Sequence, residues 1–154
     1  MSARVHVRYA RPNARHAATV RRAARAAVEL AGAPVSELTV VLTDEAGIQR
    51  LNERFAGQSL ATDVLSFPAE ALDPDSGLRY LGDVVISVPR AQAQAGQAGH
   101  ALADELRLLC VHGVLHLLGH DHGDPDSRAR MWSVQDEVLR RLGSKAPVPA
   151  GADR

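Results

Sequence analysis

The sequence predicts an α+β domain in which a small mixed four-stranded sheet packs with about five helices. Two observations indicate this class. In the first half of the chain, short β-branched runs alternate with helical stretches in the order β-α-β-α-β-β. Three helical stretches then follow one another without a further strand, and this order is typical of α+β folds. The 154 residues suffice for one domain with a hydrophobic core.

The first part of the chain supplies two strands and two helices. Residues 5–9 alternate apolar and polar side chains, as a half-buried strand does. Residues 15–30 are rich in alanine and predict a helix. The β-branched run at residues 38–42 predicts a second strand. We expect Thr43 to cap a helix over residues 44–55, which carries an apolar stripe.

The middle of the chain predicts a pair of strands joined by a turn. Residues 62–67 form the third strand, which we expect Pro68 to end. Residues 73–77 read Asp-Pro-Asp-Ser-Gly, a run of turn-forming residues. Residues 80–88 form the fourth strand, and its unbroken apolar centre predicts burial on both faces.

The last part of the chain is helical. Helices are predicted over residues 89–98 and 101–118, and Asp124 caps a third that reaches about residue 142. Residues 143–154 are mostly Gly, Ser, Pro and Ala and are expected to fray as a tail. No linker or internal repeat divides the rest, so residues 1–142 are expected to form a single domain.

Composition narrows the function classes. The formal net charge is zero, with 18 basic and 18 acidic residues, which argues against a protein that simply coats nucleic acid. No apolar run approaches the roughly 18 residues that a membrane span needs, and no signal peptide is recognised at the N-terminus. Cys110 is the one cysteine and fits a reducing compartment, so the expected location is cytoplasmic.

The positive charge is nevertheless unevenly distributed. Residues 1–25 carry seven arginines and no acidic residue. A GC-rich genome accounts for the use of arginine over lysine, but it does not account for the clustering. Because guanidinium groups bind phosphate in bidentate fashion, the segment is a candidate phosphate-contacting surface, with Arg22 and Arg25 among the candidate RNA contacts.

Three histidines predict a metal centre. His112 and His116 lie one turn apart on one helix face, Gly119 lets the chain leave the helix, and the turn brings back His122. This is the spacing of the metzincin zinc helix and turn. Three neutral imidazoles leave a fourth position open, which is typical of a catalytic zinc site, although nickel, copper and cobalt also bind imidazole.

The residues around the three histidines limit the chemistry. A metzincin carries its general base, a glutamate, directly after the first histidine, and this chain has Gly113. Asp121 could orient a histidine, His120 is a second residue that could lie behind the ligands, and Glu105 is a more remote carboxylate. None of these is assigned as a catalytic residue. Cys110 should face away from the metal, about 200° round the helix.

These motifs resemble those of the YbeY family of rRNA maturation factors. Residues 112–122, read as HGVLHLLGHDH, are similar to the family signature, and the stretches TDVLSFP (62–68) and LGDVVIS (81–87) match it further. Met131 and Glu137 also fit, and the similarity covers roughly residues 35–142.

The resemblance implies a small α+β fold with one zinc ion on His112, His116 and His122. It implies a single-strand-specific endoribonuclease that acts in 16S rRNA 3′-end maturation and ribosome quality control. The implied partners are rRNA, the small ribosomal subunit and ribosome-associated proteins, with no membrane. Attack by water and attack by the ribose 2′-hydroxyl both stay open, as does the oligomeric state.

The chain departs from the family pattern at two positions. His120 replaces the family's tyrosine in the ligand turn, and Ala56 stands where the family has a functionally important arginine. Arg54 and Arg50 are candidate substitutes as RNA contacts. Two alternatives to the nuclease therefore remain: a ribosome-biogenesis binding factor with a structural metal, and, less favoured because of Gly113, a metallopeptidase-like hydrolase.

Overall fold

The computed structural model describes residues 3–9, 13–33, 36–56, 63–120 and 123–144. Its four strands and five helices follow the predicted order. The elements are β1 (Arg4–Tyr9), α1 (Ala14–Leu30), β2 (Ser36–Thr43), α2 (Glu45–Ala56), β3 (Val64–Leu72), β4 (Arg79–Ser87), α3 (Val88–Ala98), α4 (Leu102–Leu117) and α5 (Pro125–Arg141).

The strands form one mixed sheet, as predicted. Their order is β1-β2-β4-β3. The pairs β1–β2 and β2–β4 are parallel, and β3 pairs with β4 in the antiparallel sense through a hairpin. Parallel neighbours need a long crossover, which α1 provides between β1 and β2. β1 and β3 are therefore the two edges of the sheet.

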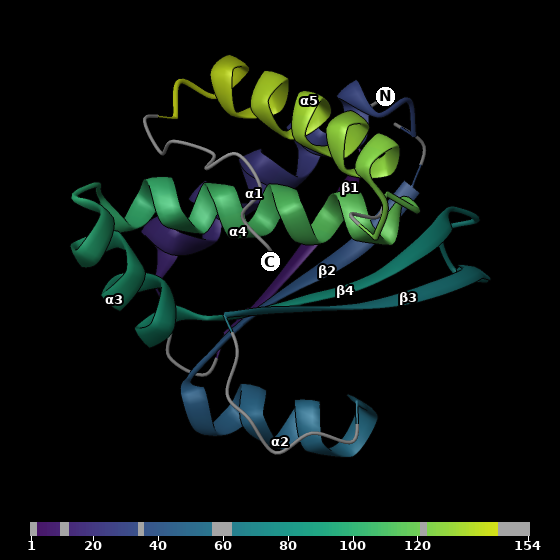
Figure 1. The fold of residues 1–154 in the computed structure, drawn as a ribbon. Coiled ribbons are helices and arrows are strands. Elements are labelled where there is room, and N and C mark those ends of the chain that lie inside the picture. Colours follow the sequence, from purple (N-terminus) through teal and green to yellow (C-terminus); the bar gives the residue numbers. More distant parts are fainter. Residues whose placement is uncertain (1–2, 10–12, 34–35, 57–62, 121–122, 145–154) are drawn as a thin grey trace.

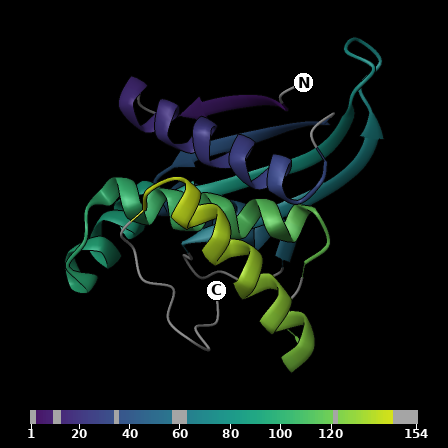
Figure 2. The same cartoon turned by 90° about the horizontal axis from the view of Figure 1, so that it is seen from above.

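The helices cover the two faces of the sheet unequally. α1 and α4 pack on one face, with α5 lying outside them, whereas α2 lies on the opposite face against β3 and β4 (Figure 1). Seen from above, α5 crosses over α4 and lies beside α1, although α1 and α5 are far apart in sequence (Figure 2). Among the described residues, no helix is long and apolar enough to cross a bilayer.

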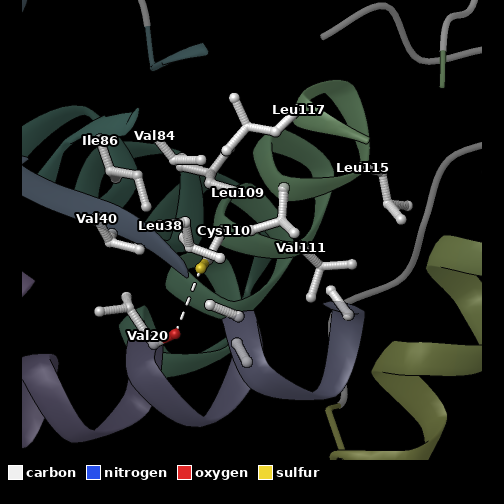
Figure 3. Close-up of a cluster of buried hydrophobic side chains, with 14 of the residues drawn as sticks. Val20, Leu38, Val40, Val84, Ile86, Leu109, Cys110, Val111, Leu115 and Leu117 are labelled. Carbon is white, nitrogen blue, oxygen red and sulfur yellow. Dashed lines mark hydrogen bonds between the residues drawn. The ribbon is translucent and has the colours of Figure 1, made fainter. Parts of the chain in front are cut away.

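α4 is the central element of the core. Twelve of its sixteen residues are buried, which explains why the helix is apolar almost all round. Its apolar side chains meet those of α1, β2 and β4 in one cluster (Figure 3). Cys110 lies in that cluster with its Sγ 3.4 Å from the carbonyl oxygen of Val20. Burial raises the pKa of the Cys110 thiol to about 12, so it stays protonated and packs as an apolar side chain.

The prediction that Pro68 ends the third strand is wrong. β3 continues through Pro68 to Leu72. It is an edge strand, so proline need not donate to a second neighbour. The pairing also shifts register between Pro68 and Ala71, and opposite it Gly82 has φ +131°. A Cβ at Gly82 would lie 2.2 Å from the Phe67 carbonyl oxygen, so only glycine fits this crossing.

The N-terminal cap of α2 also differs from the prediction. Thr43 is the last residue of β2, and Asp44 takes the capping role, with its Oδ1 accepting from the Gly47 backbone N–H at 2.7 Å. Asp124 caps α5 as predicted, accepting from the Ser127 N–H at 2.9 Å. The predicted tail begins just beyond α5, and its residues 145–154 lie outside the described part of the chain.

Candidate metal centre

α4 brings two imidazoles face to face. The Nε2 atoms of His112 and His116 lie 3.1 Å apart, and the two rings are nearly perpendicular, with an interplanar angle of 78°. This arrangement follows from their spacing, since residues four apart on a helix project from the same face. His112 is fully buried, whereas His116 is partly exposed near the end of the helix.

A hydrogen bond to α5 fixes the tautomer of His112. Its Nδ1 lies 2.9 Å from Oε1 of Gln135, which is also fully buried. Because an amide carbonyl oxygen only accepts, Nδ1 carries the proton and a neutral His112 presents a lone pair at Nε2. Metal-ligating histidines are held in this way by an acceptor behind the ring.

The geometry of the two nitrogens fits one shared ion. Two imidazole nitrogens bound at about 2.1 Å to a tetrahedral ion lie roughly 3.3–3.4 Å apart. The observed 3.1 Å is close to that value, and a bound ion would take the place of the hydrogen bond between the two rings. His112 and His116 could therefore hold a transition metal together.

The third predicted ligand lies outside the described residues. His122 and its neighbour Asp121 fall between residues 120 and 123. Within the described part of the chain, no group of three or more His, Cys, Asp or Glu side chains is placed to hold a metal. Gly119 has φ +93°, the left-handed conformation that the ligand turn was predicted to need.

His120 lies at the exit of α4. Its backbone N–H donates to the Leu115 carbonyl oxygen at 3.0 Å, which closes the end of the helix. The residue lines a hollow of about 300 Å³ together with Leu118, Gly119, Ser127 and Arg130. The structure thus places His120 in a small polar recess between the ends of α4 and α5.

Gly113 is held against the sheet. A Cβ at this position would lie 2.6 Å from Val84 Cγ1 and 3.2 Å from Ser66 Oγ, and that hydroxyl donates to the Gly113 carbonyl oxygen at 2.9 Å. A glutamate at position 113 would therefore enter the core rather than the metal site. The missing metzincin base reflects how closely α4 packs on β3 and β4.

Glu105 is not a base for this centre. Its Oε1 lies 2.7 Å from Nε2 of His100, and both side chains are buried at the start of α4. Two turns of helix separate the pair from His112. The contact between His100 and Glu105 instead holds the junction of α3 and α4.

Two neighbours of His112 were missed from the sequence, Gln135 and Trp132. The Trp132 ring centroid lies 5.9 Å from that of His112, and both residues come from α5. The sequence did contain a sign of Gln135: it is a polar residue on the same helix stripe as Met131 and Val138, which are both fully buried. A polar side chain in a buried stripe indicates a buried partner.

The four arginine candidates are not brought together with the histidines. Arg50 and Arg54 are exposed on α2, on the face of the sheet opposite to α4 (Figure 1). Arg22 and Arg25 are exposed on α1. The Arg25 Nε donates to the Ala3 carbonyl oxygen at 3.3 Å, which ties α1 to the start of β1.

Comparison with known proteins identifies one family. The family model described as Endoribonuclease YbeY matches residues 6–143. Endoribonuclease YbeY of Thermobifida fusca is 47% identical over 111 residues, which cover 69% of this chain and 72% of the relative. Endoribonuclease YbeY of Moorella thermoacetica is 44% identical over 131 residues, covering 80% and 83%.

A solved structure shares the fold at lower identity. The solution structure of TM1509 from Thermotoga maritima superimposes with a TM-score of 0.59 and 22% sequence identity. The similarity covers 96% of this chain and 99% of that chain. It supports the α+β architecture described above, from the first strand to the last helix.

Proposed function

This chain belongs to the YbeY endoribonuclease family, and on that premise we propose that it is a zinc-dependent, single-strand-specific endoribonuclease. Its role would be the maturation of the 16S rRNA 3′ end and ribosome quality control. The proposed partners are rRNA, the small ribosomal subunit and ribosome-associated proteins. The ion would be held by His112, His116 and His122.

The observation that carries the proposal is the pair of imidazole nitrogens on α4. The two Nε2 atoms face each other at 3.1 Å, and Gln135 holds the His112 proton on the far side of its ring. The lone pair of His112 is therefore directed at the shared position before any ion arrives. Such preorganisation is what a metal-assisted hydrolase requires of its protein ligands.

The donor set suits an anionic substrate. Three neutral imidazoles leave a divalent ion with its full charge, and the group behind His112 is a neutral amide rather than a carboxylate. Zinc in such a site acts as a Lewis acid on a phosphoryl oxygen and lowers the pKa of water. The recess lined by His120 and Arg130 at the exit of α4 is a candidate position for the phosphodiester.

A second candidate is a ribosome-biogenesis factor that binds RNA through a metal-stabilised fold without cutting it. Ala56, at the position of the family's functional arginine, is the observation that favours it. A peptidase is disfavoured, because position 113 packs against Val84 and has no room for the general base that such an enzyme needs.

Cleavage of single-stranded rRNA fragments tests the proposal. We expect highly purified wild-type protein with zinc to cut a 16S 3′-end fragment, and His116→Ala and metal-stripped protein to be inactive. Casein should remain uncut in the same buffer. RNA cutting that is equal in wild type and His116→Ala would point to a contaminant, and RNA binding without cutting would favour the binding factor.

A further inference from the structure

Four arginines from the two ends of the chain line one hollow. Arg21, Arg22 and Arg25 project from α1, and Arg141 projects from the last turn of α5. The hollow between the two helices has a volume of about 560 Å³, and its remaining lining residues are Ala18, Ala26, Glu29 and Leu142. The two alanines add little bulk to this lining.

A second hollow adjoins the first at Arg21. It has a volume of about 620 Å³ and runs along the exposed edge strand β1, where His6 and Arg8 border it. Arg21 lines both hollows. The two hollows therefore meet at this residue. We name the surface that they line, from β1 and the sheet beside it to α1 and the C-terminal end of α5, the α1 track.

The acidic groups of the α1 track are few, and one is already engaged. Glu37 is 3% exposed and is bound to His6 at 2.6 Å and to Ser76 at 3.2 Å. Asp73 and Glu29 are the other two carboxylates. The Asp75 backbone N–H holds the pKa of Asp73 below its usual value, so that group is anionic at neutral pH. Positive groups outnumber these carboxylates.

Two of the arginines are available to a ligand. Within the described part of the chain, no hydrogen bond or ion pair engages the side chain of Arg21 or Arg22. Arg141 of the track is paired with Glu137 at 3.1 Å. Away from the track, Arg90 binds Glu45 at 3.1 Å and Arg107 binds Asp104 at 2.8 Å. On a chain with zero net charge, unpaired guanidinium groups gathered in one groove indicate an anionic partner.

We propose that the α1 track binds the sugar–phosphate backbone of single-stranded RNA at a distance from the metal centre. Arginine forks match phosphate oxygens, and a groove made of two joined hollows suits a strand with successive phosphates. The choice of RNA as the anion rests on the proposed function. The location of the contact rests only on the arginines that line the two hollows.

The test compares two charge-matched double variants in RNA binding. R21Q/R22Q removes two unpaired guanidinium groups of the track, and R90Q/R107Q removes two guanidinium groups that carboxylates already neutralise. Both are made in the His116→Ala background, so that the RNA stays intact. Binding of a labelled 20-nucleotide single-stranded RNA is measured by fluorescence anisotropy from about 50 to 200 mM salt.

The expected result is a loss of affinity that is confined to the track variant. R21Q/R22Q should bind about tenfold more weakly, and the slope of log K against log salt should fall by about 1.4, at ~0.7 for each lost phosphate contact. R90Q/R107Q should bind within about twofold of its parent. Melting curves of both variants establish that the fold is retained.

Two results would overturn the inference. One is equal affinity and salt slope in R21Q/R22Q and its parent. The other is a track-dependent binding of phosphatidylserine vesicles with RNA affinity unchanged. Failure of the proposed nuclease function has a different signature, because wild-type protein would then cut no RNA while the R21Q/R22Q binding defect persists.

Discussion

At the scale of single residues, the hydrogen bond between His112 and Gln135 has the clearest chemical consequence. It holds the proton on Nδ1 and leaves Nε2 facing His116. The Gln135 Nε2 is buried without a hydrogen-bond partner in the described structure, so the bond to His112 is the one side-chain hydrogen bond described for this amide. Its carbonyl oxygen accepts the hydrogen bond that orients the His112 ring.

Removing this acceptor should weaken metal binding. We expect Gln135→Leu to lower zinc affinity by about 10- to 100-fold, since His112 loses the group that orients it. Gln135→Glu should retain or raise the affinity, because a carboxylate accepts the same N–H and makes the ligand more basic. Competition with a chromophoric chelator gives the affinities. ¹⁵N chemical shifts of His112 in metal-free protein report the tautomer, and an unchanged tautomer and affinity in Gln135→Leu would remove Gln135 from the centre.

Restoring an arginine at position 56 should raise RNA cleavage. α2 runs through Ala56, so residue 54 points about 200° away and Arg54 is not a simple replacement. A charge-assisted contact to phosphate is worth about 1.5–3 kcal/mol, which bounds the gain at roughly ten- to hundredfold. We expect Ala56→Arg to increase kcat/KM at least severalfold at constant metal content. Ala56→Gln is the uncharged control, and an equal gain there would contradict a phosphate contact.

At the scale of elements, the close packing of α4 on β3 and β4 decides what position 113 can carry. Gly113 is buried, and its carbonyl oxygen accepts from Ser66 on β3. Its lack of a side chain lets α4, and with it both histidines, lie directly on the sheet. The glycine is therefore a packing requirement of the helix that carries both histidines.

A methyl group at position 113 should destabilise the fold. Gly113→Ala places a Cβ 2.6 Å from Val84 Cγ1, and such overpacking costs about 1–3 kcal/mol of the free energy of unfolding. Gly96 in α3 is the matched control, because a Cβ there meets nothing within 4 Å and Gly96→Ala should stabilise by about 0.5–1 kcal/mol. Urea denaturation measures both, and equal stability of the two variants would show that α4 does not lie this close to the sheet.

Sequence patterns located the helices and strands well, but they did not show which elements lie next to one another in the fold. Periodicity, caps and glycines placed the described helices and strands within about two residues, except for the end of β3, because those signals are local. The end of β3 was misplaced because Pro68 is permitted only on an edge strand, and the position of a strand in the sheet is a long-range property. Asp44 and Thr43 are both good caps, and only the exact end of β2 decides between them.

At the scale of the whole molecule, contacts between distant segments complete both the proposed metal centre and the α1 track. The spacing of His112 and His116 could be read as a metal motif from the sequence, but Gln135 joins them only because α5 lies over α4. Likewise, Arg141 meets the α1 arginines because α5 lies beside α1 (Figure 2). The arginine cluster of the first segment was visible in the sequence, but no local pattern links residues more than a hundred positions apart, so its meeting with Arg141 could not be predicted.

Metal binding should stabilise the entire domain. An ion bound only by the folded state at one hundred times its dissociation constant adds about 2.7 kcal/mol. For a domain of this size that corresponds to a rise in Tm of roughly 5–10 °C. Chelation should therefore lower the Tm of wild-type protein by about this amount and leave that of His112→Ala/His116→Ala unchanged in calorimetry. An equal effect of chelator on both would place the stabilising ion elsewhere.

The metal content of the purified protein tests the central claim most directly. Inductively coupled plasma mass spectrometry of freshly prepared wild type, before and after dialysis against zinc, should give about one transition metal ion per chain. His112→Ala/His116→Ala should hold close to none under the same conditions. A wild-type protein that contains no transition metal and takes up no zinc on dialysis would contradict the assignment of the α4 histidines as a metal centre.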